Sequence, residues 1–464
     1  MKKRTITVLA ALSLAAVACK DSTGVSDLNN VSADALAAGL TRSSTQLLAT
    51  GLLSATRGDL SSRYVVFSET LARDFYRLDP NESRFITETL GGLSDGSGFV
   101  GGGAFTNYYT TVRSANTILN GLPSATGVTT AEKAATAGFA RTLKALALYR
   151  VLETRDSLGI AVDVNHPIDD PPAPFVCKPN ALAYISAQLD SAKTDLAAGG
   201  AAFPFIFPAS FSLNGDFTTP AAFLKFASAL KGKVELYRAL DHQKPNAGSA
   251  ATAIAELNAS YLDAGATTPA QLAASPYNGY STSAGEAVNP LSDALIYLNP
   301  SVKDSIQPGD ARAAKILTAA SNTRNGVTSA IKPITSSPTG ALVAPIAILK
   351  NSELLLLRAQ AKIETGDLVG ATADINVVRT VDGGLPPIAV PATKAAAISA
   401  VLYEKRYSLL GEGAQRFVDL RAYKYLNANF RQKELPTDPF QSALAIPINE
   451  QNARGGGTIT PTCQ

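Results

Sequence analysis

The segment LLLLRAQAKIETGDLVGATADINVV, residues 354–378, decides the fold of this chain. Its apolar residues recur at helical spacing on both sides of a central Gly-Asp pair, which predicts two consecutive helices. Gly366 is expected to end the first helix with a positive φ, and Asp367 to cap the second. Small residues such as Ala359 and Ala371 allow the two helices to pack closely. This is the pattern of a tetratricopeptide-like helical hairpin.

The rest of the chain repeats this helical pattern at irregular intervals. Helices are predicted over 31–53, 59–78, 104–121, 130–155, 180–198, 220–241, 249–263, 350–365, 368–381, 392–410 and 414–427, and a strand over 443–448. Further hairpins are expected to begin at 138–153 and 223–240, each followed by a partner helix. We therefore predict an all-α fold, a tetratricopeptide-like helical hairpin scaffold with long loop-rich insertions and minimal β structure. The longest insertion covers about 265–349 and is rich in Pro, Gly, Ser, Asn and Tyr, as functional loops often are.

The N-terminus has the organisation of a targeting signal rather than of folded structure. The basic residues MKKR precede an apolar run of 14 residues that ends at Cys19. Because Ala16-Val17-Ala18-Cys19 resembles a lipobox, we interpret residues 1–18 as a signal peptide and Cys19 as the lipidated residue. An ordinary secretory signal is the alternative. Residues 19–30 would form a tether and 31–464 a single helical domain. No later apolar segment reaches the roughly 20 residues of a membrane span, so the anchor would be lipid alone.

Composition limits the classes of function. Hydrophobic residues make up 46% of the chain and charged residues 17%, enough apolar material for a large core. The formal net charge is +3, and Lys2, Lys3 and Arg4 account for all of it. The mature chain would therefore be neutral, without the basic footprint of a nucleic-acid-binding protein.

The glycine-rich stretch GGLSDGSGFVGGG, residues 91–103, matches two catalytic patterns by sequence. It contains a G-x-S-x-G arrangement around Ser94 and a G-x-G-x-x-G arrangement beginning at Gly96. A nucleophile elbow requires a buried strand before the serine, and a dinucleotide loop requires a strand–helix unit. Neither surrounds this stretch, and only His166 and His242 could serve as a base. We interpret it as a flexible connection between helices, near which a ligand could bind.

Metal and cysteine chemistry are equally limited. No metal-binding motif occurs, although Asp74, Asp79 and Glu82 would suit calcium if they were not simply a solvated loop. We therefore predict no cofactor, metal or catalytic residue. Cys177 and Cys463 both lie next to prolines, and an exported chain would meet oxidising conditions. A disulfide between these two cysteines and two free thiols both remain open.

The segment LYEKRYSLLGEGAQRFVDLRAY, residues 402–423, resembles the ER-x-x-EL…EG…R…DL-R signature of the SusD/RagB family. The positions that match are Glu404, Arg406, Leu409, Glu412, Gly413, Arg416, Asp419, Leu420 and Arg421. Ser408 stands where a glutamate is common, and the gap before Asp419 is one residue longer. The segments at 105–122, 355–379 and 443–453 resemble further parts of the family pattern. We expect the charged residues to be structural, with Glu404 and Arg406 on one helix meeting Arg416, Asp419 and Arg421 on the next.

The resemblance implies a surface-exposed, nutrient-binding lipoprotein of the outer membrane. Such a protein captures an oligosaccharide or peptide and acts as the lid of a TonB-dependent, SusC-like transporter, without catalysis. Two alternatives remain from the residues alone. One is a tetratricopeptide-like periplasmic adaptor lipoprotein, and the other is a lipoprotein hydrolase that uses Ser94 or an acidic pair.

Two tyrosine-containing clusters are the predicted ligand site. The chain has no tryptophan but 15 tyrosines. Aromatic faces beside charged and amide groups suit a hydroxyl-rich or peptide ligand, although packing beneath their own loops is the alternative. The resemblance points to the same two regions. The predicted ligand-binding residues are Asp74, Phe75, Tyr76, Arg77, Asp79 and Asn81 in the first cluster and Tyr277, Asn278 and Tyr280 in the second.

Overall fold

A computed structural model describes residues 39–57, 64–92, 99, 102–167, 169–336 and 341–456. The predicted signal peptide and tether, the lipidation residue Cys19, and also Ser94 and Cys463, lie outside the described residues. Cys177 is disulfide-bonded, and its pairing with Cys463 stays a prediction.

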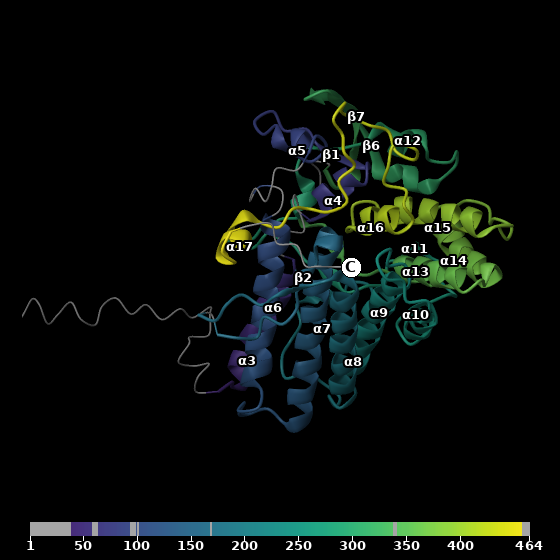
Figure 1. Cartoon of the computed structure of the whole chain (residues 1–464). Coiled ribbons are helices and arrows are strands. Elements are labelled where there is room, and N and C mark those ends of the chain that lie inside the picture. Colours follow the sequence, from purple (N-terminus) through teal and green to yellow (C-terminus); the bar gives the residue numbers. More distant parts are fainter. Residues whose placement is uncertain are drawn as a thin grey trace, which may run out of the picture.

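The main helices follow one another in space in the order of the sequence (Figure 1). They are α3 (Arg42–Thr56), α6 (Gly103–Gly121), α7 (Thr130–Arg155), α8 (Lys178–Ala197), α9 (Pro220–Ala239), α10 (Gly248–Asn258), α13 (Asn351–Glu364), α14 (Leu368–Val381), α15 (Lys394–Ser408) and α16 (Gln415–Ala422). Each packs against the next in this series. Shorter helices are α4 (Val66–Leu71), α5 (Arg84–Thr87), α11 (Pro269–Leu272), α12 (Pro300–Asp304) and α17 (Ile448–Ala453).

The hairpin that decides the fold has the predicted geometry. Gly366 follows α13 with φ +85°, a conformation that favours glycine. The Asp367 side chain accepts a hydrogen bond from the backbone N–H of Gly370 at 2.8 Å and so caps α14. Ala359 and Ala371 are fully buried in one apolar cluster between the helices. The predicted helical hairpin is confirmed.

Two further hairpins rely on glycines at the helix contact. A Cβ at Gly138 of α7 would lie 2.5 Å from the side chain of Leu196 of α8. A Cβ at Gly232 of α9 would lie 2.6 Å from the side chain of Leu257 of α10. Since real side chains do not approach this closely, both glycines permit the tight packing of their helix pairs. The pairs predicted to begin at 138–153 and 223–240 therefore form.

Strands are few and short within the described residues. They form four two-stranded antiparallel sheets: β1 (Phe75–Arg77) with β5 (Ile296–Leu298), β2 (Ile160–Ala161) with β3 (Phe175–Val176), β4 (Tyr277–Asn278) with β8 (Ile346–Ala347), and β6 (Ile316–Arg324) with β7 (Val327–Pro333). Most of these strands lie in or pair with the predicted insertion. The all-α fold class with minimal β structure is confirmed.

Several predicted elements differ from the structure, and the helices expected over 249–263 and 414–427, for example, end at Asn258 and Ala422. The helix expected over 59–78 ends at Leu71, because Arg73 has a φ of +67° and the chain continues as β1, paired with β5. The helix expected from residue 31 begins at Arg42 in the described part, after Thr41 as its cap. The strand expected over 443–448 does not form.

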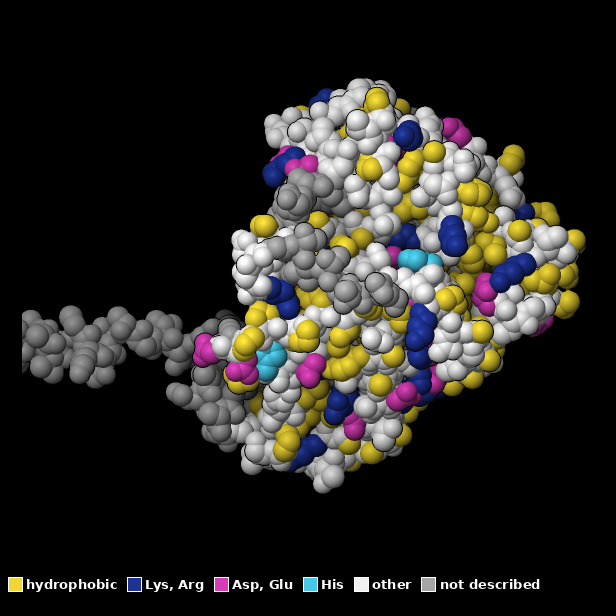
Figure 2. All heavy atoms as spheres, in the orientation of Figure 1, with side chains coloured by type: hydrophobic (Ala, Val, Ile, Leu, Met, Phe, Trp, Pro, Cys, Tyr) yellow, Lys and Arg dark blue, Asp and Glu magenta, His cyan; other side chains and the backbone are white. Residues whose placement is uncertain are grey.

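No helix among the described residues is long and apolar enough to cross a bilayer. On the face seen in Figure 2, Lys and Arg side chains lie interspersed with Asp and Glu. This face shows no extended area of one charge, consistent with the balanced composition outside the first residues.

Candidate functional site

The tyrosine cavity, as we name it, has a volume of about 430 Å³. It lies where the end of α3, the loop around 208–211 and the segment 277–286 meet. The residues that line it are Thr50, Leu53, Ser54, Thr56, Arg57, Pro208, Ser210, Phe211, Tyr277, Asn278, Gly279, Tyr280, Ser281, Ser283 and Glu286. All three predicted residues of the second cluster, Tyr277, Asn278 and Tyr280, therefore border one cavity.

Local structure fixes the segment that carries these residues. Tyr277 lies opposite Ala347 in the β4–β8 pair, and its hydroxyl donates a hydrogen bond to the Ala273 carbonyl at 2.6 Å. Gly279 contacts the Ser210 side chain so closely that no Cβ could be accommodated there. The segment is thus held from two sides, which makes the cavity wall well defined.

Two polar groups of the cavity wall have no hydrogen-bond partner among the described residues. They are the Tyr280 hydroxyl and Nδ2 of Asn278, and both atoms are buried. Burial raises the pKa of Tyr280 to about 12, so its hydroxyl is neutral at pH 7 and can both donate and accept. Since buried polar groups are usually paired, such atoms are ready to bind the polar groups of a ligand.

Arg57 and Glu286 provide charge beside these two groups. Their side chains form an ion pair at 3.2 Å, and the Arg57 guanidinium lies 5.9 Å from the centroid of the Tyr280 ring. Neither residue could be predicted from the sequence, because the two are 229 positions apart and neither belongs to a motif. Only the packing of α3 against the insertion brings them together.

Unlike the second cluster, the first predicted cluster has three members in the protein interior. Asp74, Phe75 and Tyr76 are at most 2% exposed. The Tyr76 hydroxyl donates to Glu434 at 3.0 Å and also accepts a hydrogen bond from Asn299 at 2.6 Å. A role of these three residues in ligand binding stays a prediction, but each has its contacts inside the protein.

Arg77, Asp79 and Asn81 lie nearer the surface. Arg77 forms ion pairs of 2.9 Å with both Asp79 and Asp293, and its guanidinium lies 4.0 Å from the centroid of the Phe85 ring. The Asn81 backbone N–H donates to Asp79. None of these residues lines the tyrosine cavity, so the two predicted clusters do not share that cavity.

Metal binding was considered for Asp74, Asp79 and Glu82. Within the described ranges, no group of three or more His, Cys, Asp or Glu residues is arranged to hold a metal ion. Asp74 is buried beside arginines, and Glu82 pairs with Arg84 at 2.5 Å. These carboxylates therefore already have cationic partners in the protein.

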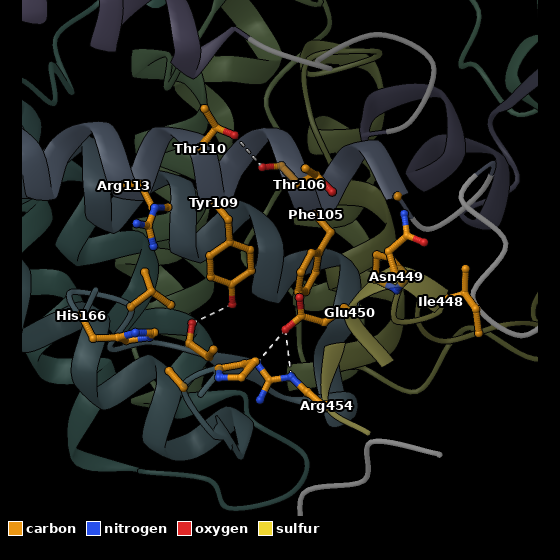
Figure 3. A pocket seen from close by; sticks show the side chains of 16 residues that line it. Phe105, Thr106, Tyr109, Thr110, Arg113, His166, Ile448, Asn449, Glu450 and Arg454 are labelled. Carbon is orange, nitrogen blue, oxygen red and sulfur yellow. Dashed lines mark hydrogen bonds and ion pairs between the residues drawn. The ribbon is translucent and has the colours of Figure 1, made fainter. Parts of the chain in front are cut away.

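A second cavity of about 640 Å³ lies along α6 (Figure 3). Its wall combines α6 with the loops that follow β2 and with α17. The residues that line it are Gly102, Phe105, Thr106, Tyr109, Thr110, Arg113, Ala161, Val164, His166, Pro172, Ala173, Pro447, Ile448, Asn449, Glu450 and Arg454. No motif of the sequence indicates a site at this position.

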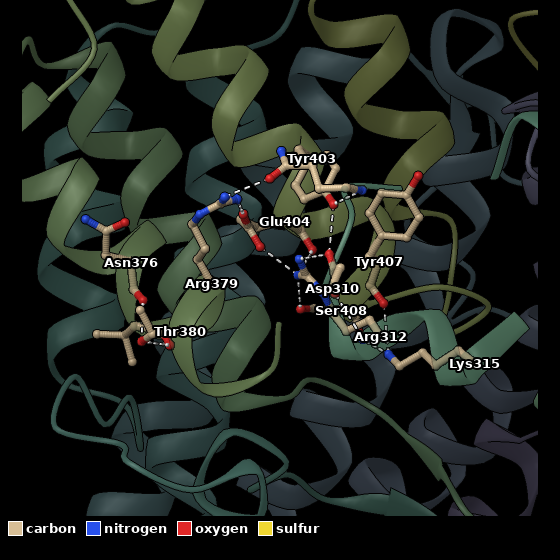
Figure 4. Close-up of polar contacts among 12 residues, drawn as sticks. Asp310, Arg312, Lys315, Asn376, Arg379, Thr380, Tyr403, Glu404, Tyr407 and Ser408 are labelled. Carbon is tan, nitrogen blue, oxygen red and sulfur yellow. Dashed lines mark hydrogen bonds and ion pairs between the residues drawn. The ribbon is translucent and has the colours of Figure 1, made fainter. Parts of the chain in front are cut away.

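The charged residues of segment 402–423 are buried or half-buried, and their ion-pair partners lie outside the segment, except that Lys405 and Asp419 pair with each other. Glu404 pairs with Arg312 at 2.6 Å and with Arg379 at 2.9 Å (Figure 4). Burial raises the pKa of Glu404, and the two guanidiniums oppose this effect. Arg312 is also bound by Asp310 at 2.7 Å. Glu404 thereby joins α15 to α14 and to the insertion.

Arg406 and Arg416 share one carboxylate. Asp74 lies 2.7 Å from Arg406 and 3.5 Å from Arg416, so this carboxylate holds α15 and α16 against the end of α4. Asp419 pairs instead with Lys405 at 2.7 Å. We call the buried charges of this segment and their partners the motif network.

The remaining members of the motif network bind other helices. Arg421 donates to the backbone carbonyl of Glu153 at 2.6 Å, and Glu412 pairs with Lys350 at 2.6 Å. Gly413 lies in a tight place, because a Cβ there would lie 2.5 Å from Gln415 Oε1. The expected direct pairing of Glu404 and Arg406 with the acidic and basic residues of the next helix is wrong. Apart from the Lys405–Asp419 pair, the charges bind more distant elements, because those elements reach the buried side of α15 and α16.

Comparison with known proteins agrees with this architecture. Residues 323–444 match the SusD family. A SusD superfamily protein from Bacteroides thetaiotaomicron superposes with a TM-score of 0.66 at 14% identity, covering 90% of this chain and 98% of that one. A SusD-like carbohydrate binding protein from Bacteroides vulgatus has a TM-score of 0.66 at 13% identity, covering 91% and 98%. A SusD superfamily protein from Bacteroides fragilis has a TM-score of 0.65 at 14% identity, covering 90% and 95%. No curated protein matches the sequence.

The resemblance to the SusD/RagB family is thereby confirmed. The family's sequence pattern covers residues 323–444, which include the hairpin 354–378 and the motif at 402–423. The fold of SusD superfamily structures extends over about nine-tenths of the chain. The chain therefore has the fold of SusD superfamily structures over most of its length, together with the family's sequence pattern in residues 323–444.

Proposed function

We propose that this chain is a lipid-anchored, surface-exposed binding protein of the outer membrane that captures an oligosaccharide for uptake. The observation that carries the proposal is the tyrosine cavity, in which the buried Tyr280 hydroxyl and Asn278 Nδ2 have no hydrogen-bond partner among the described residues and lie beside the Arg57–Glu286 pair. The similarity to a SusD-like carbohydrate binding protein supports the same ligand class.

The chemistry of the cavity suits a sugar. Tyrosine rings offer apolar faces for the C–H groups of a pyranose, while unpaired donors and acceptors bind its hydroxyls. Each hydrogen bond to a ligand then satisfies a group that is otherwise unpaired in the protein. Such a site supports moderate, reversible affinity, as delivery to a transporter requires. Binding without a chemical step is the activity we propose.

The remaining part of the proposal concerns anchoring and the partner. Lipidation of Cys19 after removal of residues 1–18 would attach the domain to the membrane. A TonB-dependent, SusC-like transporter would be the partner over which the protein closes as a lid. A Cys19→Ala variant should leave the membrane fraction, and wild-type protein cross-linked in cells should recover a barrel transporter. A Cys19→Ala variant that still requires detergent for extraction would contradict the lipid anchor.

The ligand class is tested with an array that presents neutral and acidic oligosaccharides beside short peptides. The purified domain should bind a subset of the oligosaccharides, and an Asn278→Ala variant should bind them more weakly. Binding to peptides alone would reassign the ligand to a peptide. Binding of oligosaccharides that is equal in the wild type and the variant would move the site away from the tyrosine cavity.

A further inference from the structure

The cavity along α6 continues into a second one. A cavity of about 330 Å³ adjoins it and is lined by Arg113, Asn116, Thr117, Asn120, Val164, Asn165, His166 and Pro167. Arg113, Val164 and His166 line both cavities. The two therefore form one depression, which we call the α6 groove. It is separate from the tyrosine cavity, with which it shares no lining residue.

Arg113 supplies a positive charge without a counter-charge in this groove. Its side chain is exposed, and its guanidinium makes no ion pair or hydrogen bond in the part of the chain that the structure describes. The other arginine of the groove, Arg454, is neutralised by Glu450 at 2.6 Å and stacks on Phe175 at 4.5 Å. Figure 3 shows Arg113 and His166 toward the same end of the cavity. This end suits an anion, because its cation has no ion-pair partner in the described part of the chain.

The same end carries amide groups suited to hydroxyls. Asn116 is 5% exposed, and its buried Nδ2 has no hydrogen-bond partner among the described residues. Asn120 and Asn165 donate to each other at 2.9 and 3.2 Å, which fixes their side chains across the groove. An unpaired buried donor is unusual in a native protein and is satisfied when a ligand oxygen binds.

The other part of the groove provides an aromatic wall. The Phe105 and Tyr109 rings lie 4.6 Å apart, centroid to centroid. The Tyr109 hydroxyl donates to the Ala161 carbonyl at 2.6 Å, so its ring is held in place and remains partly exposed. A fixed ring face next to a cation and amides is a suitable surface for a sugar that also carries a charge.

We propose that the α6 groove is a binding site for an acidic oligosaccharide, with Arg113 pairing with a sugar carboxylate. The guanidinium matches a carboxylate in a bidentate arrangement, which a neutral sugar cannot offer. Asn116 binds a hydroxyl of the same sugar residue, and the Tyr109 ring contacts a neighbouring sugar residue. The inference rests on the proposed oligosaccharide-binding function and adds a second site with selectivity for charge.

The test uses calorimetric titration with tri-galacturonic acid and with its fully methyl-esterified form, which has the same sugars without the charge. Wild-type protein should bind the acid, and esterification should weaken binding about tenfold or more. Arg113→Gln should weaken binding of the acid by a similar factor and leave binding of the ester almost unchanged. Lys225→Gln removes one exposed positive charge from α9, outside the groove, and should bind the acid as the wild type does.

Two results would overturn this inference. One is equal affinity of the wild type and Arg113→Gln for the acid, which would place that ligand elsewhere. The other is no binding of the acid by the wild type. If neutral oligosaccharides still bind in that case, only the proposed acidic site in the α6 groove is contradicted. If no oligosaccharide binds at all, the proposed function fails with it.

Discussion

The motif network and the tyrosine cavity make opposite use of polar side chains. In the motif network every charged residue discussed above has a partner, such as Glu404 between Arg312 and Arg379. In the tyrosine cavity the Tyr280 hydroxyl and the Asn278 amide lack partners among the described residues. The charged residues of the motif at 402–423 thus hold helices together, whereas the tyrosine cavity contains the unpaired polar groups to which we assign ligand binding.

The largest loss of stability is expected from replacing Asp74, a predicted ligand residue that the structure places between two arginines. Asp74→Ala should reduce the free energy of unfolding by about 3–5 kcal/mol, because Arg406 and Arg416 would keep buried charges without their carboxylate. Urea denaturation measures the change. The control Lys394→Gln breaks an ion pair with Glu364 in which Lys394 is 54% exposed, and should change stability by less than about 1 kcal/mol. Similar values for both variants would contradict a structural role of the motif network.

Asp156, whose carboxylate lies 3.7 Å from the Arg421 guanidinium, tests the motif network through pH. Burial acts to raise its pKa, but Arg421 and then Lys178 outweigh burial and lower the pKa to about 2 from an ordinary value of 3.8. A lowered carboxyl pKa stabilises the folded state above pH 3.8, and this contribution is lost as the pH falls toward 2. Asp156→Asn should therefore be about 2 kcal/mol less stable at pH 7 than the wild type.

Asparagine is a suitable replacement at this position, because Asp156 has a φ of +47°, which asparagine tolerates. The difference between the two proteins should shrink as the pH is lowered from 4 to 2. Unfolding measured by circular dichroism over this range checks the result. A difference that does not depend on pH would show that the charge of Asp156 is not its source.

The smallest changes of stability are expected in the tyrosine cavity, where a paired and an unpaired tyrosine hydroxyl can be compared. Tyr277→Phe removes a hydroxyl that donates to Ala273 and should lower stability by about 1 kcal/mol. Tyr280→Phe removes a hydroxyl that has no hydrogen-bond partner among the described residues, and should leave stability unchanged or slightly higher. Melting temperatures of the two variants provide the measurement. Equal losses would mean that both hydroxyls are paired in the protein.

Helices with a regular apolar period could be predicted closely from the sequence. The helix expected over 130–155 forms as α7 with these bounds, since a capping box at Thr129 and Glu132 marks its start. The prediction that a helix extends to residue 78 was wrong. Phe75 pairs with Leu298 in a strand, and a contact between such distant segments cannot be read from the local pattern. The β6–β7 hairpin was missed although Asn325-Gly326, with φ of +49° and +85°, is a known hairpin signal.

The candidate site was predictable only in part. Tyr277, Asn278 and Tyr280 were found because aromatic and amide residues gather in a loop-rich insertion. Arg57 could not be found, since its place beside Tyr280 depends on how α3 packs against that insertion. The burial of Asp74 could not be predicted for the same reason, because the sequence shows a charged residue but not the arginines that surround it in the fold.

The most direct measurement is the affinity of the wild type, Tyr280→Phe and Tyr277→Phe for an oligosaccharide selected from the array, obtained by calorimetric titration. The central claim is that unpaired polar groups of the tyrosine cavity bind the ligand. It predicts that Tyr280→Phe weakens binding about threefold to tenfold without loss of stability, as expected for one hydrogen bond. It also predicts that Tyr277→Phe, whose hydroxyl is already paired, changes the affinity less. Unchanged affinity in Tyr280→Phe, or a larger loss in Tyr277→Phe, would contradict the claim.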